Sequence, residues 1–428
     1  MDLSRPAAKL ITAEGEPGLR DAVSAPSSPY GSFASYRSLL LISCAVCFGC
    51  YSGAYMRIPI LPLFARSLGA DNLQVGIITS SFMLAAGLLC LPLGIMSDRL
   101  GRKRLILSGL LVSAIGSLLL GFCRTPLQMM GVYVLSGAGI AAFAPTMMSF
   151  VTDISPKTHL GRSYGWYTMA MYGGMSLGPA MGGFAGQFFS FEWVFGISGI
   201  IAFVMFWIVV GCLPRRKNPS HHNGVVRRGS RTIFRELLRN RALLACWLVT
   251  LISCFGLGVF VTFVSLHASD KGVGVGRIGL IFGTQALVNA VCRIPFGHLS
   301  DRVRDRSKLV LSGLLGYSAA IAGIGLSGSL PYFLASAFLM GISMGVAFTA
   351  VGALISEVVP ADSRGLAMGG YNTCIYIGMM LSGLVMGFVT RELGFQAGFL
   401  ITALLNAVGA VSFGLLFRAV AVGKRTLA

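Results

Sequence analysis

The chain has 428 residues, of which 55% are hydrophobic and only 11% are charged, and its formal net charge is +19. An average soluble domain has roughly a quarter of charged residues, so this composition excludes an ordinary soluble protein. The positive charge could indicate a nucleic-acid partner, but no base-reading motif accompanies it, and we expect none.

The first 37 residues are rich in Ser, Pro and Ala, carry both charges, and lack a short apolar core with a cleavage site. This composition predicts a disordered cytosolic tail and not a signal peptide.

Apolar blocks of about 20 residues fill most of the remaining chain, and each is long enough to cross a hydrocarbon core roughly 30 Å thick as a helix. We expect spans at residues 38–64, 73–96, 104–122, 127–152, 163–188, 193–213, 242–267, 275–299, 308–328, 330–358, 367–389 and 394–417. The sequence therefore predicts an all-α integral membrane protein with twelve transmembrane helices.

The first span contains an arginine, Arg57, within the apolar stretch CYSGAYMRIPILPLF. A guanidinium left in the middle of a membrane costs about 3 kcal/mol or more. Arg57 should therefore either face an aqueous cavity, where it would contact an anion or polar ligand, or extend to the outer interface. Cys44, Cys47 and Cys50 lie nearby, and we interpret them as helix-packing residues and not as metal ligands. The ten cysteines predict no disulfide framework.

A loop sequence after span two recurs after span eight. GIMSDRLGRKR begins at Gly94, and GHLSDRVRDRSK begins at Gly297, 203 residues later. The offset becomes 204 after one insertion, so Asp153 corresponds to Glu357. This duplication predicts two pseudo-symmetric six-helix bundles with a solute site between them. The expected divisions are a tail at 1–37, bundles at 38–213 and 242–418, a basic linker at 214–241 and a tail at 419–428.

Lys and Arg are distributed unevenly across the expected topology. Of the 34, 27 lie on the side of the N-terminus, 5 lie on the other side, and Arg57 and Arg293 lie within spans. This is the positive-inside pattern, so both termini and the linker are expected in the cytoplasm.

The motifs resemble those of one known family. Gly94-x-x-x-Asp98-Arg99-x-Gly101-Arg102-Lys103 is similar to the loop motif of the major facilitator superfamily, and Asp301, Arg302 and Arg306 form a degenerate second copy. Span five carries a pattern that resembles a motif of many antiporters, built from Gly174, Gly178, Pro179, Gly182 and Gly183. The resemblance covers roughly residues 38–418.

The resemblance implies that the loop-motif charges form a cytosolic latch with an acid at the end of span four. That acid would be Asp153, and Glu357 and Arg364 would belong to the second copy. Such charges could pair when the cytosolic face is closed and separate when it opens. The alternative is that they only fix topology. The glycines share one face of a helix and permit close approach of another backbone, and Pro179 bends the helix. They predict either a hinged seam between the bundles or plain close packing.

Span eight carries Gln285, Asn289 and Arg293 at four-residue spacing, which places them on one helix face. Arg293 either lines the cavity or extends to the cytosolic boundary. The full set of expected cavity residues is Arg57, Tyr55, Tyr172, Gln285, Asn289, Arg293, Asn372 and Tyr376.

No acid lies deep within a span, since all 15 fall in tails, loops or span ends. Many drug/proton exporters of the family carry such an acid and an arginine early in span four, where this chain has Tyr133. Proton coupling would have to use Asp98, Asp153 or a histidine, and we expect His267 and His298 at the membrane interfaces.

The leading interpretation is a secondary transporter that exports a small organic compound by alternating access, with protons as the candidate coupling ion. One alternative is a permease for an anion, metal ion or metal complex that uses Arg57, and another is a transporter-like sensor or assembly partner. No nucleophile–base pair or metal cluster indicates an enzyme, and no cofactor is expected. We expect a monomer in a bacterial cytoplasmic membrane or a membrane continuous with it.

Overall fold

The computed structural model describes residues 36–214, 235, 237–303, 305–360 and 363–425, and within these the regular elements are all helical. The N-terminal half comprises α1 (Tyr36–Met56), α2 (Leu61–Ser67), α3 (Asn72–Leu100), α4 (Arg102–Leu120), α5 (Pro126–Ile154), η1 (Lys157–His159), α6 (Leu160–Phe188) and α7 (Phe191–Cys212). The C-terminal half comprises α9 (Arg241–Asp270), α10 (Val275–Arg302), α11 (Arg306–Leu326), α12 (Leu330–Val358) and α13 (Arg364–Arg425). The predicted linker lies mostly outside the described residues.

Ten stretches of the described chain are long and apolar enough to cross a membrane. α6 is not among them, because Ser, Tyr and Gly dilute its apolar residues, and α13 contributes one stretch of 52 residues. Apolarity alone therefore does not reproduce the expected count of twelve, although every predicted span overlaps a helix.

Two predicted spans differ from the structure in continuity. The first span is broken at residues 57–60, between α1 and α2, where Pro59 can donate no backbone hydrogen bond. The last two spans form α13, which is interrupted at Gly394 (φ 81°, ψ 170°). The helix then continues to Arg425, so it includes residues 419–425 of the expected tail.

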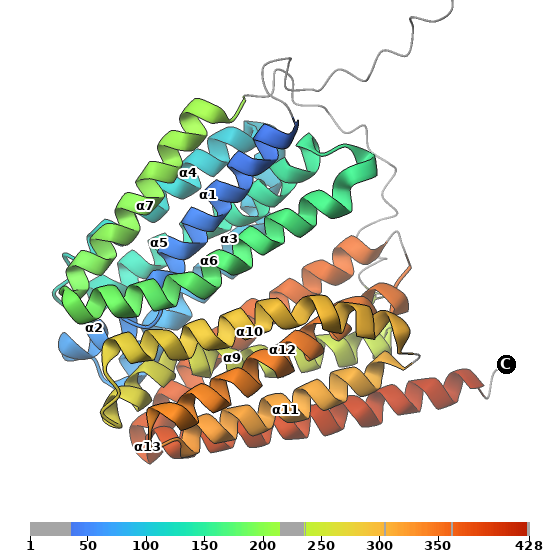
Figure 1. The fold of residues 1–428 in the computed structure, drawn as a ribbon. Coiled ribbons are helices and arrows are strands. Elements are labelled where there is room, and N and C mark those ends of the chain that lie inside the picture. The colour runs from blue at the N-terminus through green and yellow to red at the C-terminus, as the bar shows by residue number, and fades with distance from the viewer. Residues whose placement is uncertain (1–35, 215–234, 236, 304, 361–362, 426–428) are drawn as a thin grey trace, which may run out of the picture.

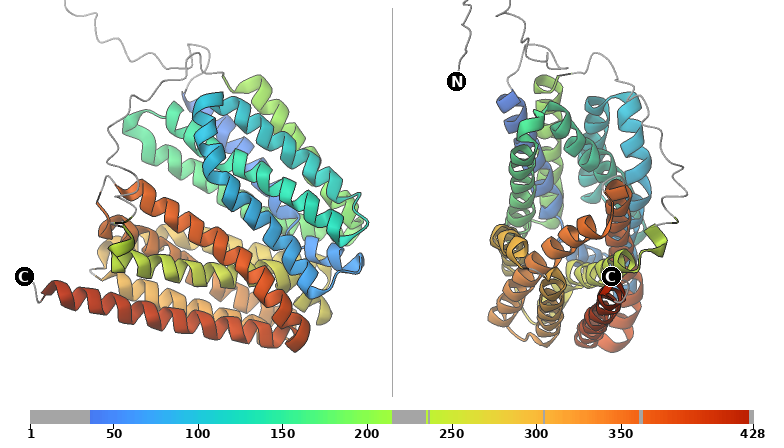
Figure 2. Two further views of the ribbon diagram at one scale, coloured as in Figure 1. Left: turned by 180° about the vertical axis from the view of Figure 1, so that it is seen from behind. Right: turned by 90° about the vertical axis from the view of Figure 1, so that its right-hand side faces the viewer.

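The helices form two bundles, one from each half of the chain (Figures 1 and 2). Each half has a buried cluster of its own: one contains Ile106 and Phe150, and the other contains Val310 and Ile355. A third cluster joins the two halves, because it includes Phe64 and Phe195 with Phe260 and Phe263. The halves are therefore packed together at one end of the molecule. We call this end the far side, and we call the opposite end, where the two loop motifs lie, the motif side.

Two helix pairs, α3 with α13 and α6 with α10, join the bundles. A side chain at Gly76 of α3 would collide with the backbone of Gly383 in α13. A side chain at Gly279 of α10 would lie 2.6 Å from the carbonyl oxygen of Pro179 and 2.9 Å from the Cα of Gly183 in α6. Gly76 and Gly279 are equivalent positions of the repeat. Both contacts between the bundles therefore require a glycine, which has no Cβ, at the same position of each half.

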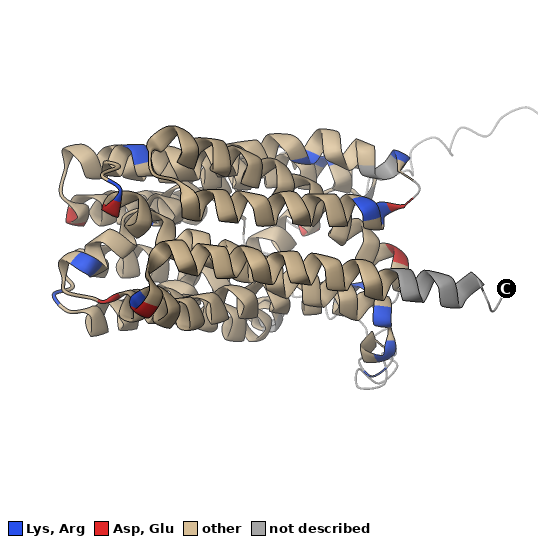
Figure 3. Ribbon diagram, turned by 90° about the horizontal axis from the view of Figure 1, so that it is seen from below, with Lys and Arg blue, Asp and Glu red and all other residues tan. Residues whose placement is uncertain are grey.

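The charged residues gather mostly at the two ends of the helices, and the middle is nearly free of them (Figure 3). Many large apolar side chains on the outer surface of the helices are exposed, among them Leu88, Trp207 and Leu404. Lipid is the solvent that such a surface requires.

Candidate functional site

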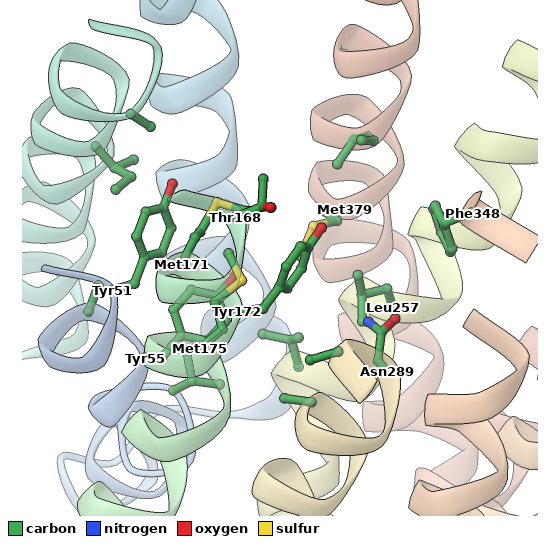
Figure 4. A pocket seen from close by; sticks show the side chains of 18 of the residues that line it. Tyr51, Tyr55, Thr168, Met171, Tyr172, Met175, Leu257, Asn289, Phe348 and Met379 are labelled. Carbon is green, nitrogen blue, oxygen red and sulfur yellow. The ribbon is translucent and has the colours of Figure 1, made fainter. Parts of the chain in front are cut away.

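A cavity of about 1260 Å³ lies between the two bundles. α1, α3, α5 and α6, with a few residues of α4 and α7, line it from the N-terminal half, and α9, α10, α12 and α13 line it from the C-terminal half. Tyr55 and Tyr172 project from one wall, and Leu257 and Asn289 project from the other (Figure 4). The cavity is therefore shared by the two repeats.

The structure places all eight residues that we expected to line a cavity on its wall: Arg57, Tyr55, Tyr172, Gln285, Asn289, Arg293, Asn372 and Tyr376. Contact with a solute remains a prediction for each of them. Sequence reasoning missed other lining residues, among them Tyr133, Ser136 and Met175. These residues are surrounded in the sequence by apolar or small residues, so the sequence does not indicate which face of the helix they occupy.

Arg57 lies in the break between α1 and α2 and is only 4% exposed. Its Nη1 donates to Ser136 Oγ at 3.5 Å, which is long for a hydrogen bond, and its Nε has no hydrogen-bond partner. The side chain therefore does not extend to the outer interface. It reaches the cavity wall as a buried cation, and no carboxylate lines that wall in the described chain.

Arg293 also remains at the cavity. Its guanidinium lies over the ring of Tyr172, 4.3 Å from the ring centroid, and its Nε donates to Asn289 Oδ1 at 3.3 Å. Tyr172 belongs to α6 and Arg293 to α10, so this cation–π contact joins the two bundles. In this position the Arg293 side chain does not extend to the membrane boundary, which was the alternative expectation.

Ion pairs close the far side. Arg66 Nη1 lies 2.5 Å from Asp270 Oδ1, and Arg391 Nη1 lies 3.6 Å from Asp71 Oδ2. Both pairs link one bundle to the other, and Asn72 Nδ2 adds a bond to Thr390 O at 3.2 Å. On the motif side, the cavity wall extends to partly exposed residues such as Arg162, Trp166 and Asn372. The cavity is thus sealed on the far side and reaches the motif side.

A family model described as the Major Facilitator Superfamily matches residues 41–274 and 246–427. The chain belongs to the major facilitator superfamily. It is therefore a multi-pass membrane transporter and not an enzyme.

Two relatives in this superfamily align with most of the chain. An uncharacterised transporter of the superfamily from Methanocaldococcus jannaschii is 26% identical over 359 residues, which is 83% of this chain and 92% of the relative. A multidrug resistance protein from Proteus mirabilis is 25% identical over 373 residues, which is 84% of this chain and 91% of the relative.

A solved structure shares the fold. A bacterial homologue of the human lysosomal transporter Spinster, in an inward-facing and unoccupied conformation, superposes with a TM-score of 0.76 and is 17% identical. The match covers 91% of this chain and 98% of the homologue.

The superfamily loop motif forms ion pairs within each half. Arg102, the first residue of α4, binds Asp153 at the end of α5. In the second copy, Arg306 Nη1 lies 2.6 Å from Glu357 Oε1. Both pairs are made although the cavity reaches their side, and the role of the motif charges as a latch stays a prediction. Each pair ties the start of one helix to the end of another within a bundle.

The other residues of the loop motif lie outside these two ion pairs. Gly101 joins α3 to α4 with φ 89°, a backbone conformation that favours glycine. Arg302 and Arg364 are exposed at the motif side. The side chains of Asp98, Arg99 and Asp301 lie outside the described part of the structure, and their proposed roles stay predictions.

The glycines of α6 have two partners. Side chains at Gly174 and Gly178 would lie 2.7 Å from Phe48 O and 2.6 Å from Ser52 O of α1, and one at Gly182 would collide with Met56. These three glycines therefore pack α6 within its own bundle, and the expectation that they form a seam between bundles is wrong for them. Gly183 and Pro179 face α10 and do lie between the bundles.

His267 is buried within the protein. It is 3% exposed and lies near the far side among the rings of Phe333, Phe395 and Phe399, at centroid distances of 5.5, 5.9 and 5.5 Å. Its Nε2 has no hydrogen-bond partner. His298, by contrast, is exposed on α10 near the motif side, as we expected.

Proposed function

We propose that this protein exports small organic compounds from the cytoplasm by alternating access. The observation that supports the proposal most directly is the cavity that both bundles line, sealed by interbundle ion pairs on one side only. A solute can enter such a cavity from the motif side, and rocking of the bundles can then expose it to the far side.

The direction of export is supported by two further observations. The excess of Lys and Arg on the motif side favours a cytoplasmic location for it, so the cavity would load from the cytoplasm. A relative that matches most of the chain is a multidrug resistance protein from a bacterium, and resistance through a membrane transporter is most simply explained by export. We place this chain in a cytoplasmic membrane with its termini inside.

Transport of a free metal ion has less support. Within the described residues, no group of three or more His, Cys, Asp or Glu side chains is placed to hold a metal. The cavity wall described above is instead mostly apolar and aromatic, which is the usual lining of an organic-ligand site.

Flux measurements in proteoliposomes test this proposal. We expect the protein to move at least one class of organic compound, anionic, neutral or cationic, saturably and faster than protein-free liposomes do. An imposed proton gradient should change the rate if protons are the coupling ion. If compounds bind to the protein and none is moved, the transport proposal is wrong and the sensor alternative is favoured.

A further inference from the structure

We propose that the cavity selects organic anions, namely small organic acids whose negative group binds at Arg57 and whose apolar body lies against the tyrosines and methionines of the wall. This inference rests on the proposed function, because it names the substrate class of the same cavity. The proposed ligands all carry a negative charge.

The charges on the cavity wall are all of one sign. Among the described lining residues, the ionised side chains are Arg57, Arg162 and Arg293, and there is no Asp, Glu, Lys or His. A cleft lined by one sign of charge with apolar walls concentrates ligands of the opposite sign and repels those of the same sign. The wall thus favours an anion over a cation.

The hydrogen-bonding state of Arg57 indicates where the anion binds. A guanidinium has five N–H donors, and in Arg57 a single bond of 3.5 Å to Ser136 is made while Nε has none. The C-terminal end of α1 at Met56 supplies partial negative charge, which offsets part of the burial penalty but leaves donors unfilled. A carboxylate would match the guanidinium with two parallel bonds.

Tyr133 extends the same subsite. It is 8% exposed and lines the same cavity as Arg57. Together with Ser136 on the next turn of α5, it offers polar atoms beside the guanidinium. The subsite is therefore a small polar group in a wall that is mostly apolar.

The rest of the wall indicates an organic body and not an inorganic ion. The lining includes six tyrosines, at 51, 55, 133, 172, 371 and 376, and seven methionines, at 83, 169, 171, 175, 344, 368 and 379. Flexible thioethers and ring faces suit apolar and aromatic groups of variable shape. A volume of about 1260 Å³ also exceeds the 300–1,000 Å³ that is usual for drug-sized ligands, so an organic acid fits with room for water.

Matched ligands separate charge from shape. We would measure binding of 1-naphthylacetate, its uncharged amide 1-naphthylacetamide, and 2-(1-naphthyl)ethylamine, which is a cation, by calorimetry on protein in nanodiscs of phosphatidylcholine. Empty nanodiscs give the correction for partition into lipid. A panel of other aromatic and alkyl acids with their amides extends the comparison beyond one ring system.

We expect acids to bind at least about tenfold more tightly than their amides, because a charge-assisted hydrogen bond contributes that much, and the amine to bind more weakly still. Arg57→Gln should remove the preference for the acid and leave amide binding unchanged, and Arg57→Lys should retain part of it. Arg277→Gln removes an exposed arginine of α10 that does not line the cavity, and it should leave the preference intact.

The inference is overturned if no acid in the panel binds more tightly than its amide, or if Arg57→Gln keeps the preference. These outcomes are distinct from failure of the proposed function. Discrimination between acid and amide without any flux in proteoliposomes would refute transport and retain the ligand class. Flux of cations or neutral compounds alone would retain transport and refute the ligand class.

Discussion

At the scale of single residues, the two arginines within the spans differ in how their charge is accommodated. Arg293 lies over the ring face of Tyr172 and bonds to Asn289, so it has favourable partners within the protein. Arg57 has a single hydrogen bond, to Ser136, and at 3.5 Å it is long. The same residue type is thus held by packing in one bundle and left with unfilled donors in the other.

The contact between Arg293 and Tyr172 can be tested by matched substitutions. Tyr172→Phe keeps the aromatic face, so we expect near-normal transport. Tyr172→Leu removes the ring, and with it a contact worth about 0.5–2 kcal/mol. We expect transport by this variant to fall roughly two- to thirtyfold at equal protein abundance.

Transport assays of purified variants at matched protein content would measure the difference. Equal loss in the Phe and Leu variants would indicate that the hydroxyl is required, and equal retention would show that the cation–π contact has no part in transport.

The loop-motif pairs illustrate a different constraint. Arg102 is the first residue of α4, and Asp153 lies in the last turn of α5. A cation at a helix N-terminus and an acid at a C-terminus both oppose the helix dipole. Their mutual ion pair offsets this cost, and Arg306 and Glu357 repeat the arrangement in the second half.

At the scale of helices, glycine determines how closely α6 approaches its neighbours. Gly174 and Gly178 bring α6 against α1, whereas Gly183 brings it against α10. Because these contacts are with backbone atoms, an added Cβ cannot be accommodated by moving a flexible side chain.

Gly183→Ala should therefore weaken closure of the far side. The new Cβ would lie 2.7 Å from Gly279 Cα and 2.9 Å from Val275 O, and overpacking of this kind typically costs about 1–3 kcal/mol. We expect spin labels on exposed far-side residues, Arg124 in one half and Lys271 in the other, to show a larger population of long distances. The labels require prior replacement of the ten native cysteines.

Gly131→Ala on α5 is the matched control, because its Cβ would meet nothing within 4 Å. If Gly183→Ala and Gly131→Ala give the same distance distribution as the parent protein, the close approach of α6 and α10 does not determine closure.

The sequence allowed the helices to be predicted better than their contacts. Apolar block length located the spans, and the repeat of Gly94 and Gly297 predicted two bundles. The only sign of the break after Met56 in the sequence is the pair Pro59 and Pro62. Prolines also lie inside continuous helices of this protein, so they do not by themselves predict a break. Which neighbour each glycine of α6 faces depends on helix rotation, and a stripe of small residues does not encode it.

The far-side ion pairs and the burial of His267 were equally beyond prediction. Arg66 and Asp270 are separated by 204 residues and come together only because the bundles converge at that end. His267 lies in the last turn of α9, a position typical of an interface residue, but Phe333, Phe395 and Phe399 from other helices enclose it. Both the ion pairs and the burial of His267 depend on tertiary packing between helices that are distant in the sequence.

At the scale of the whole molecule, the two bundles resemble each other in sequence, in their motif-side ion pairs and in the glycines that join them. Such pseudo-symmetry permits a second conformation in which the seal forms on the motif side. The far side is held by two partly exposed interbundle ion pairs, Arg66–Asp270 and Arg391–Asp71, and exposed pairs of this kind contribute little each. These pairs therefore add little to the closure of the far side, which depends mainly on the apolar cluster and the glycine contacts between the bundles.

Distances between spin labels across both ends of one cysteine-replaced protein test alternating access most directly. One pair would be Arg124 and Lys271 on the far side, and the other His159 and Arg364 on the motif side, all of them exposed. As a transported solute is added, we expect the far-side distance to lengthen and the motif-side distance to shorten in the same proportion of molecules. Distances that stay fixed, or that lengthen together at both ends, would contradict movement of the two bundles about a shared cavity.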